Sequence, residues 1–345
     1  MKNTISISIL TIFLLLLSAC GGSGGGSGSD NTDSLNLEKW ELIDTGTSPI
    51  AIGLERHNNT VYMSLNAFNN NTALASTTDG LNLQYFTTNN TSELISFIDE
   101  TNRIHLRNSH SDNGVTFVNK TDLVPFGGLM TGSSSAFIAN TYMTFKNTLI
   151  TDPLKMSFDG GDTWSGIDLD ADINTREFIM PTEPAFNGSF LLADFDNGLW
   201  FSNNSGSNWS KILVSDGHFE AVAANINFPN RFYAAKLNAL YRSDDNGSQW
   251  SIKTPSDLIN QSITQWLVLV LADDGALYAW GVPSGSSDDR GQVFLSTDGG
   301  TTWTLKGESI GYSRDSFIPL TTAKMVVNDN YIFVLDNDKF YKLPR

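Results

Sequence analysis

Residues that could do chemistry gather in one short stretch of the sequence, STDGGTTW at 296–303. It sets a carboxylate, two glycines and several hydroxyls beside a tryptophan, and such residues could hold a metal ion or a phosphate group. The same residue types also build tight turns, because an Asp side chain accepts backbone N–H groups across its own turn and Gly supplies a positive φ. One copy alone does not choose between these two interpretations.

The stretch recurs along the chain, and the recurrence favours a structural role. Four copies share one frame: Ser, any residue, Asp or Asn, any residue, Gly, any residue, a polar residue and Trp. The framed residues are Ser157, Asp159, Gly161, Trp164, Ser202, Asn204, Gly206, Trp209, Ser243, Asp245, Gly247, Trp250, Ser296, Asp298, Gly300 and Trp303. A weaker copy keeps Asp112 and Gly114 and ends on Phe117, and another at 77–85 ends on Tyr85.

Each good copy lies between two short stretches of alternating apolar and polar residues, such as QVFL before and WTLK after the copy at 296–303. Alternation around a Gly/Asp/Asn turn predicts a β-hairpin. The repeated frame resembles the Asp-box, or bacterial neuraminidase repeat, of sialidases, sortilin-type receptors, some glycoside hydrolases and photosystem assembly factors. The resemblance implies a β-propeller in which these turns belong to the scaffold and lie away from the central pocket.

The aromatic residue that closes each turn gives a count of the blades. These residues are Trp40, Tyr85, Phe117, Trp164, Trp209, Trp250 and Trp303. Their separations are 45, 32, 47, 45, 41 and 53 residues, and four-stranded blades take about 40–50. The interval of 32 predicts a reduced second blade, and the interval of 53 contains a surplus at 281–291.

The two ends of the repeat region complete each other. KWELI, which contains Trp40, looks like a strand that follows a turn, yet no framed turn precedes it. We therefore expect the N-terminal strand to complete the last blade, a closure that removes exposed sheet edges. The expected fold is all-β: a single propeller of seven four-stranded blades, with six as the alternative count.

The first residues predict export and lipidation. A short basic start, an apolar run from Ile5 to Leu17 and the sequence Leu17-Ser18-Ala19-Cys20 resemble a bacterial lipoprotein signal, with ordinary cleavage beside a chance Cys as the alternative. We expect a signal peptide at 1–19, lipidated Cys20 with a Gly/Ser-rich tether at 20–36, and the propeller at 37–345. Gly21, a non-Asp residue, favours the outer membrane by resemblance to the bacterial sorting rule, on either its periplasmic side or the cell surface.

Composition excludes one class of partner. The formal net charge is −16 and the pI is about 4.5, so the surface repels phosphate backbones and nucleic acid is not an expected partner. Charged residues make up only 17% of the chain. Abundant Asn, Ser, Thr and Gly suit short strands joined by polar turns. We expect a monomer without a cofactor.

Two kinds of active site can be compared with the sequence. In sialidases an Arg within a Phe/Tyr-Arg-Ile-Pro motif binds the substrate carboxylate, whereas the nearest string here, Phe317-Ile318-Pro319, lacks the Arg. Alternating acids at Asp168, Asp170 and Asp172 resemble a calcium loop. Ile residues stand where an EF-hand requires Gly and Glu, so a solvated acidic turn is the preferred interpretation, and neither a metal nor a catalytic residue is expected.

The sequence thus favours a non-enzymatic envelope lipoprotein whose propeller is a binding platform for an envelope protein or a carbohydrate. The alternative is a divergent sialidase-like or other glycoside hydrolase acting on extracellular glycans; an assembly factor like those of photosystems also fits the fold. Within the surplus at 281–291, Asp288, Asp289 and Arg290 form the expected partner contact.

Overall fold

The computed structural model describes most of the chain from Leu37 onward. The described residues are 37–45, 50–66, 72–87, 95–98, 103–106, 109–119, 136–138, 141–144, 154–157, 165–167, 178–179, 190–194, 198–204, 207–214, 219–236, 239–253, 263–283, 290–311, 324–336 and 339–345. Predictions for residues 1–36, including Cys20, lie outside this set. So do those for Asp159, Gly161, Trp164, Asp168, Asp170, Asp172, Gly206, Asp288 and Asp289.

The strands form seven four-stranded antiparallel sheets. Blade 1 consists of β2 (Ile50–His57), β3 (Thr60–Asn66), β4 (Thr72–Thr77) and β5 (Gln84–Thr87). Blade 2 consists of β6 (Ile95–Ile98), β7 (Ile104–Leu106), β8 (Ser109–Ser111) and β9 (Val118–Asn119). Blade 3 consists of β10 (Ala136–Ile138), β11 (Thr141–Thr144), β12 (Leu154–Ser157) and β13 (Ser165–Ile167). Blades 4 and 5 consist of β14 (Phe178–Ile179), β15 (Phe190–Asp194), β16 (Gly198–Ser202), β17 (Ser210–Val214); and β18 (Ala221–Ala223), β19 (Phe232–Lys236), β20 (Ala239–Ser243), β21 (Ser251–Lys253). Blades 6 and 7 consist of β22 (Ile263–Leu271), β23 (Leu277–Pro283), β24 (Arg290–Ser296), β25 (Thr304–Gly311); and β26 (Lys324–Val327), β27 (Tyr331–Asp336), β28 (Lys339–Pro344), β1 (Glu41–Leu42). The described residues include no helix, and hence none long and apolar enough to cross a membrane.

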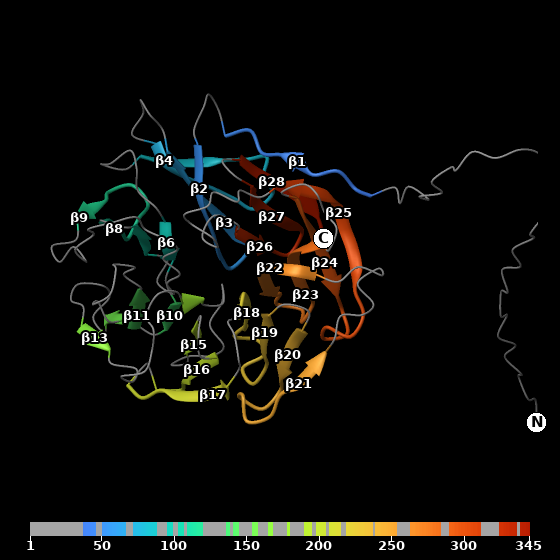
Figure 1. The fold of residues 1–345 in the computed structure, drawn as a ribbon. Coiled ribbons are helices and arrows are strands. Elements are labelled where there is room, and N and C mark those ends of the chain that lie inside the picture. Colours follow the sequence, from blue (N-terminus) through green and yellow to red (C-terminus); the bar gives the residue numbers. More distant parts are fainter. Residues whose placement is uncertain are drawn as a thin grey trace, which may run out of the picture. The chain divides into compact units, whose positions relative to one another are not determined.

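Neighbouring sheets contact each other mainly through their first strands. β2 contacts β6 on one side and β26 on the other, β6 contacts β10, and β22 contacts β18 and β26. Figure 1 shows the sheets following one another in chain order around a centre, with these first strands innermost. This is the architecture of a β-propeller, and the predicted count of seven blades is confirmed.

The last blade joins the two ends of the propeller, as predicted. In β1, Glu41 and Leu42 pair with Lys342 and Tyr341 of β28. Trp40, which leads into β1, donates from its indole Nε1 to the carbonyl oxygen of Glu308 in blade 6 at 2.9 Å. The N-terminal strand therefore supplies both the missing fourth strand of blade 7 and a contact with the preceding blade.

Blades 2 and 6 account for the two irregular intervals of the sequence. Blade 2 keeps four strands within its short interval because they are only four, three, three and two residues long. The predicted reduction thus shortens the strands and removes none of them. In blade 6 the first three strands have nine, seven and seven residues, so part of the surplus extends the sheet.

The hydrophobic core lies between neighbouring blades. One cluster combines residues of blades 6 and 7, and others join blades 5 and 6, 7 and 1, 4 and 5, and 1 and 2. Trp266 and Trp280, on the first two strands of blade 6, are fully buried. Because each cluster needs two sheets, the inter-blade layers stabilise the ring as a whole.

Candidate functional site

The turn between the third and fourth strands of a blade, here called the frame turn, is held by its own side chains. In blade 6 the Asp298 carboxylate accepts the backbone N–H groups of Thr301 at 3.0 Å and Thr302 at 2.8 Å. Ser296 Oγ donates to Asp298 Oδ1 and accepts the N–H of Gly300, each at 2.8 Å. Burial acts to raise the pKa of Asp298, but these hydrogen bonds outweigh it and lower the pKa to about 2.

Blades 1 and 2 have frame turns that are one residue shorter. Asn113 Oδ1 accepts the N–H groups of Val115 and Thr116, both at 2.8 Å, and lies near Ser111 Oγ at 3.2 Å. The acceptor in blade 2 is therefore Asn113, and the assignment of that role to Asp112 is corrected. Asp112 is exposed and pairs with Arg103, because the shortened turn places the accepting side chain directly before the glycine.

The frame-turn glycines that the structure describes, Gly80, Gly114, Gly247 and Gly300, face the preceding blade. A Cβ atom added to Gly300 would collide with Leu240 Cδ2 of blade 5, and one added to Gly247 would lie 2.5 Å from Ile212 Cδ1 of blade 4. Both residues have positive φ, at 89° and 81°. The frame turns thus act as close inter-blade contacts, which only glycine permits at these two positions.

The closing aromatics are buried to different degrees. Trp303 is 5% exposed, packs 6.4 Å from the Trp266 ring centre and donates to the carbonyl oxygen of Gly300. Trp209 and Trp250 are half-buried, and Phe117 is buried. Trp250 Nε1 also reaches the carbonyl oxygen of Ile212 in blade 4, at 3.1 Å. The contacts of these aromatics, like those of the glycines, are structural.

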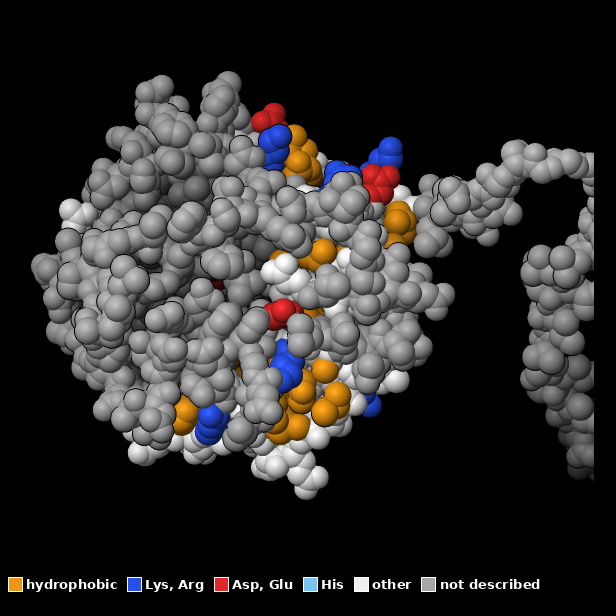
Figure 2. Space-filling model, viewed as in Figure 1, with side chains coloured by type: hydrophobic (Ala, Val, Ile, Leu, Met, Phe, Trp, Pro, Cys, Tyr) orange, Lys and Arg blue, Asp and Glu red, His pale blue; other side chains and the backbone are white. Residues whose placement is uncertain are grey.

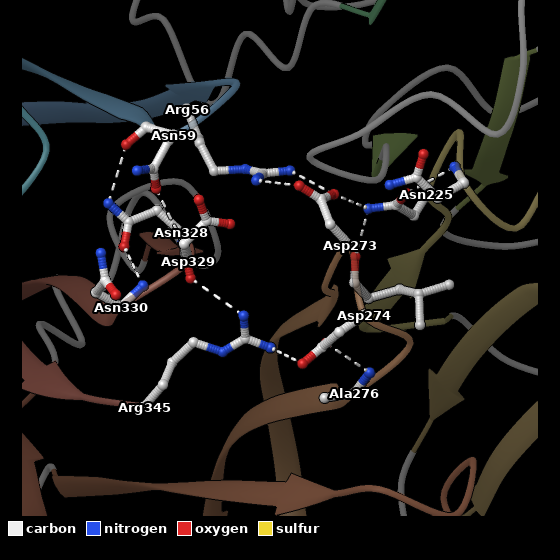
Figure 3. Close-up of polar contacts among 12 residues, drawn as sticks. Arg56, Asn59, Asn225, Asp273, Asp274, Ala276, Asn328, Asp329, Asn330 and Arg345 are labelled. Carbon is white, nitrogen blue, oxygen red and sulfur yellow. Dashed lines mark hydrogen bonds and ion pairs between the residues drawn. The ribbon is translucent and has the colours of Figure 1, made fainter.

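A second set of turns, between the first and second strands, lies at the same end of the blades, because an antiparallel meander alternates its turns between two ends. Polar side chains from these turns meet Arg56, near the end of β2, and Arg345, which follows β28. We call them the axial cluster; its members are Arg56, Asn225, Asp273, Asp274, Asn328 and Arg345 (Figure 3). They come from blades 1, 5, 6 and 7.

One half of the axial cluster is an ion pair between blades that are not neighbours. Arg56 Nη1 and Nη2 donate to the two carboxylate oxygens of Asp273 at 2.8 and 3.0 Å. Asn225, fully buried, donates to Asp273 Oδ1 and to the carbonyl oxygen of Leu271, both at 2.9 Å. Since blade 7 separates blade 1 from blade 6 around the ring, Arg56 must reach Asp273 on the axial side of blade 7.

The other half is built around Arg345, at the end of β28. Its Nη2 lies 2.6 Å from Asp274 Oδ2, and its Nε donates to the Tyr278 hydroxyl at 2.9 Å. Its Nη1 approaches the carbonyl oxygen of Asn328 at 3.3 Å. The Asn328 amide in turn donates to the carbonyl oxygen of Asn59 at 3.0 Å, so blades 6, 7 and 1 are linked in sequence.

The electrostatics of the cluster keep both carboxyl groups ionised. The hydrogen bonds from Arg56 are the main reason that the pKa of Asp273 lies below its usual range, against the opposing effect of burial. Burial raises the pKa of Asp274, but hydrogen bonds from Ala276 N–H and Arg345 outweigh it and the net shift is downward. A general acid for glycoside hydrolysis needs a raised pKa, so these two carboxylates suit charge pairing and do not suit proton donation.

The described member of the expected partner contact, Arg290, lies away from this cluster, and so does a second group of arginines. Arg290 is exposed at the start of β24 and pairs with Gly311. Arg231 and Arg242 both bind Asp244, each at 2.8 Å. In the part of the chain that the structure describes, no three His, Cys, Asp or Glu residues are grouped so that they could hold a metal ion.

Sequence reasoning did not find the axial cluster, although a signal for it exists. In four blades Asn- or Asp-rich residues stand at the end of the first strand or within two residues after it: RHNN at 56–59, NIN at 225–227, DDG at 273–275 and NDN at 328–330. Such runs are ordinary turn signals. Only the ring geometry shows that they converge.

Comparisons with known proteins bear on the fold. No protein-family model matches the chain, and no curated protein matches it in sequence. Among solved structures, YCF48 from Cyanidioschyzon merolae is similar, with TM-score 0.55 and 12% identity over 88% of this chain and 98% of that one. A structure of YCF48 bound to D1 peptide has TM-score 0.53 and 14% identity, over 90% and 98% of the two chains.

A GH74 enzyme from Niastella koreensis is also similar, with TM-score 0.57 and 14% identity over 86% of this chain. This chain matches only 43% of that enzyme. At such low identity these likenesses show the β-propeller fold alone, and the same fold carries both binding and hydrolytic functions.

Proposed function

We propose that the chain is a non-enzymatic lipoprotein of the bacterial envelope, anchored through Cys20 in the outer membrane, whose propeller binds a polypeptide segment of an envelope protein. The observation that favours a binding role over hydrolysis is the axial cluster. Its guanidinium groups are engaged by carboxylates of the same chain, and its carboxyl groups are ionised. A site arranged for hydrolysis would instead need one carboxyl group kept protonated.

Because the axial cluster occupies the end of the ring that carries the frame turns, it favours the opposite end for ligand binding. Arg56, 7% exposed, and its partner Asp273 lie at the end that carries the frame turns. The connections between second and third strands lie at the opposite end, and the connection within 281–291, with Arg290 exposed beside it, is among them. A polypeptide ligand is supported by the likeness to YCF48, whose structure with D1 peptide shows that this fold accommodates a peptide.

Binding and hydrolysis are separated by testing the purified full chain on three panels. Arrays of extended peptides and of oligosaccharides measure binding, and fluorogenic glycosides with purified polysaccharides measure turnover. We expect peptide binding, reduced at least tenfold when residues 284–289 are replaced by a short Gly/Ser link, with unchanged binding in the matched variant Ser248→Ala on the frame-turn end. Glycoside turnover that disappears when a carboxylate is substituted would instead establish the hydrolase.

The lipid anchor is tested independently of the ligand. Labelled palmitate should incorporate into the full chain and not into Cys20→Ser, which should leave the membrane fraction. Ser18→Ala, which keeps the small-residue pattern before Cys20, is the matched control. Equal labelling of wild type and Cys20→Ser would contradict lipidation at that residue.

A further inference from the structure

Among the described residues, exposed large apolar side chains are most numerous on one sector of the propeller, and Figure 2 shows hydrophobic side chains at the surface near β20 and β21 as well. Five of the exposed large apolar residues belong to blades 7, 1 and 2: Leu42 (58% exposed), Leu81 (71%), Tyr85 (47%), Val115 (77%) and Val118 (53%). All five lie in a frame turn or in the first residues of a fourth strand. We call this set the apolar rim. Two others, Ile226 and Ile252, belong to blade 5.

The five residues lie on consecutive blades whose frame turns and fourth strands touch. A Cβ atom on Gly80 would lie 3.2 Å from Ile43 Cδ1, so the residues next to this pair, Leu42 and Leu81, lie on adjoining parts of blades 7 and 1. A Cβ atom on Gly114 would lie 2.7 Å from Phe86 Cε1, which places Tyr85 and Val115 in the same relation across blades 1 and 2. The contacts between blades thus place the exposed apolar residues on adjoining frame turns and fourth strands, with Leu42 and Tyr85 on the opposite strand face from Ile43 and Phe86.

The other blades provide an internal comparison for the rim. The residue after the frame-turn glycine is Leu81 in blade 1 and Val115 in blade 2, but it is Ser207 in blade 4, Ser248 in blade 5 and Thr301 in blade 6. All five are exposed. Since the fold tolerates a small polar residue at this position, the apolar residues of blades 1 and 2 are not required by the turn.

The path of the chain supports a lipid surface as the occupant of the apolar rim. Residues 37–40 lead directly into β1, where Leu42 begins the series. If Cys20 is acylated, as the proposed function holds, the Gly/Ser-rich tether has a mean reach of roughly 20–25 Å from the bilayer. The propeller is then held near the lipid by this sector, and weak apolar contacts become effective because the surface is always at high local concentration.

Charge selects the kind of lipid surface. The exposed charged residues beside Leu42 are mostly acidic: Glu38, Glu41 and Asp44 against Lys39. Asp112 is exposed beside Val115. Anionic headgroups would be repelled, whereas aliphatic side chains and a Tyr are residues that enter the interface of a neutral bilayer. We propose that the apolar rim rests on a zwitterionic lipid surface and orients the propeller with blades 7, 1 and 2 against the membrane.

Labels attached to single cysteines test this orientation. Because Cys20 is the only Cys of the sequence and is blocked once acylated, an introduced Cys takes an environment-sensitive fluorophore without competition. Leu81→Cys and Val115→Cys probe the rim, and Ser248→Cys and Thr301→Cys probe the same turn position on blades 5 and 6. Each lipidated full chain is placed on phosphatidylethanolamine/phosphatidylcholine vesicles that contain spin-labelled lipid.

We expect the lipid to quench the fluorophores at 81 and 115 at least threefold more than those at 248 and 301. Replacing a third of the lipid with phosphatidylglycerol should reduce this difference. In the chain labelled through Val118→Cys, the double substitution Leu81→Ser and Val115→Ser should lower quenching to the level seen at 301, with an unchanged melting temperature.

Equal quenching at all four turn positions in chains that float with the vesicles would overturn the proposal while leaving the lipid anchor intact. The proposal is also overturned if labels at 81 quench one another between copies and not through lipid, because the occupant would then be a second chain. Failure of the wild-type chain to float with vesicles contradicts the anchor itself, and the orientation with it.

Discussion

Two acidic turns of blade 6, the frame turn at Asp298 and the axial turn at Asp273, lie at the same end of the sheet and are stabilised in different ways. Asp298 is held by Ser296, Thr301 and Thr302, all within four residues. Asp273 is held by Arg56, which is 217 residues away in sequence, and by Asn225, which is 48 away. The first is a local turn, and the second exists only when the ring has formed.

The difference has a thermodynamic consequence. A frame turn can form in an isolated hairpin, so the contribution of its hydrogen bonds to stability depends little on whether the neighbouring blades are folded. The axial cluster joins non-neighbouring blades, so its interactions contribute only to the assembled ring and couple the blades to one another. Substitutions in the two regions should therefore differ in size and in additivity.

The largest expected effect is at the frame turn of blade 6, where Trp303 reaches the core. Trp303→Ala should reduce the free energy of unfolding by about 3–5 kcal/mol, because a buried indole is replaced by a cavity beside Trp266. Urea denaturation followed by circular dichroism measures the loss. In blade 1 Leu83 stands in the place of Trp303, directly before the fourth strand. Tyr85, the aromatic residue that the sequence suggests for this role, lies two residues further on and is exposed, so Tyr85→Ala should cost less than about 1 kcal/mol. Equal losses would show that Trp303 does not serve as a core residue.

An intermediate effect is expected at the axial cluster. Arg56→Ala removes both hydrogen bonds to Asp273 and should cost roughly 1–3 kcal/mol, less than a fully buried pair, because the Asp273 side chain is 39% exposed. A double-mutant cycle with Asp273→Ala should give a clear coupling energy. The surface pair Arg231–Asp244, with side chains 28% and 52% exposed, is the matched control and should give about 0–1 kcal/mol. Equal coupling in the two pairs would contradict the special place of Arg56.

Acid should weaken both regions, with a smaller effect per group. Folding lowers the pKa of Asp298 to about 2, from an unfolded value of about 3.9. The unfolded chain thus binds protons first on acidification, so the contribution of Asp298 is complete above about pH 5 and is lost as pH falls from about 4 through 2. Asp273, also shifted downward, has the same sign.

Asp298→Asn isolates the contribution of the frame turn to acid sensitivity. The amide oxygen can keep the two backbone hydrogen bonds, as the Asn204 oxygen keeps that to Asn208 in blade 4. The variant should lose about 0.5–1 kcal/mol at pH 7 and should show a shallower loss of stability between pH 4 and 2. The free energy of unfolding is measured between pH 4 and 2 for the variant and for wild type. The same dependence on pH in both proteins would show that the carboxylate does not contribute.

The smallest effect concerns the turn backbone. Asn246 in blade 5 has φ of 59°, and its counterpart Gly299 in blade 6 has φ of 74°. Asn246→Gly should change stability by no more than about 0.5 kcal/mol, because Asn already tolerates this region. Gly299→Asn should be the more destabilising of the two, since a Cβ there would meet Arg242 Nη1 and the guanidinium would have to leave its 3.3 Å contact with the Gly299 carbonyl oxygen. Thermal melts of the pair test whether the two turns differ through packing and not through φ.

Most of the fold could be predicted from the sequence because it is built from local units that repeat. The spacing of Tyr85, Phe117, Trp209, Trp250 and Trp303 predicts seven blades, which the sheets confirm. The strand at Trp40 completes blade 7 as expected. The acceptor of blade 2 was misplaced by one residue, because the turn there omits the residue between acceptor and glycine.

The axial cluster could not be predicted in the same way. Arg56, Asp273 and Arg345 stand in unrelated local contexts, and nothing in the spacing of a single chain relates them. Their meeting depends on how seven sheets close into a ring, and a reduced or lengthened blade would change which residues face one another. Non-local polar networks are thus the part of this protein that depends most on its three-dimensional structure.

The pairing of β1 with β28 also affects how late in folding the last blade can be completed. Glu41 lies opposite Lys342, so one partner of the closing strand is made about three hundred residues after the other. At roughly 5–20 residues per second of synthesis, the first strand waits about 15–60 s for its neighbour. Until the two strands meet, the sheet of blade 7 lacks its fourth strand, and contacts of such sequence separation form slowly. Completion of the last blade is therefore the step at which this propeller is most exposed to misassembly.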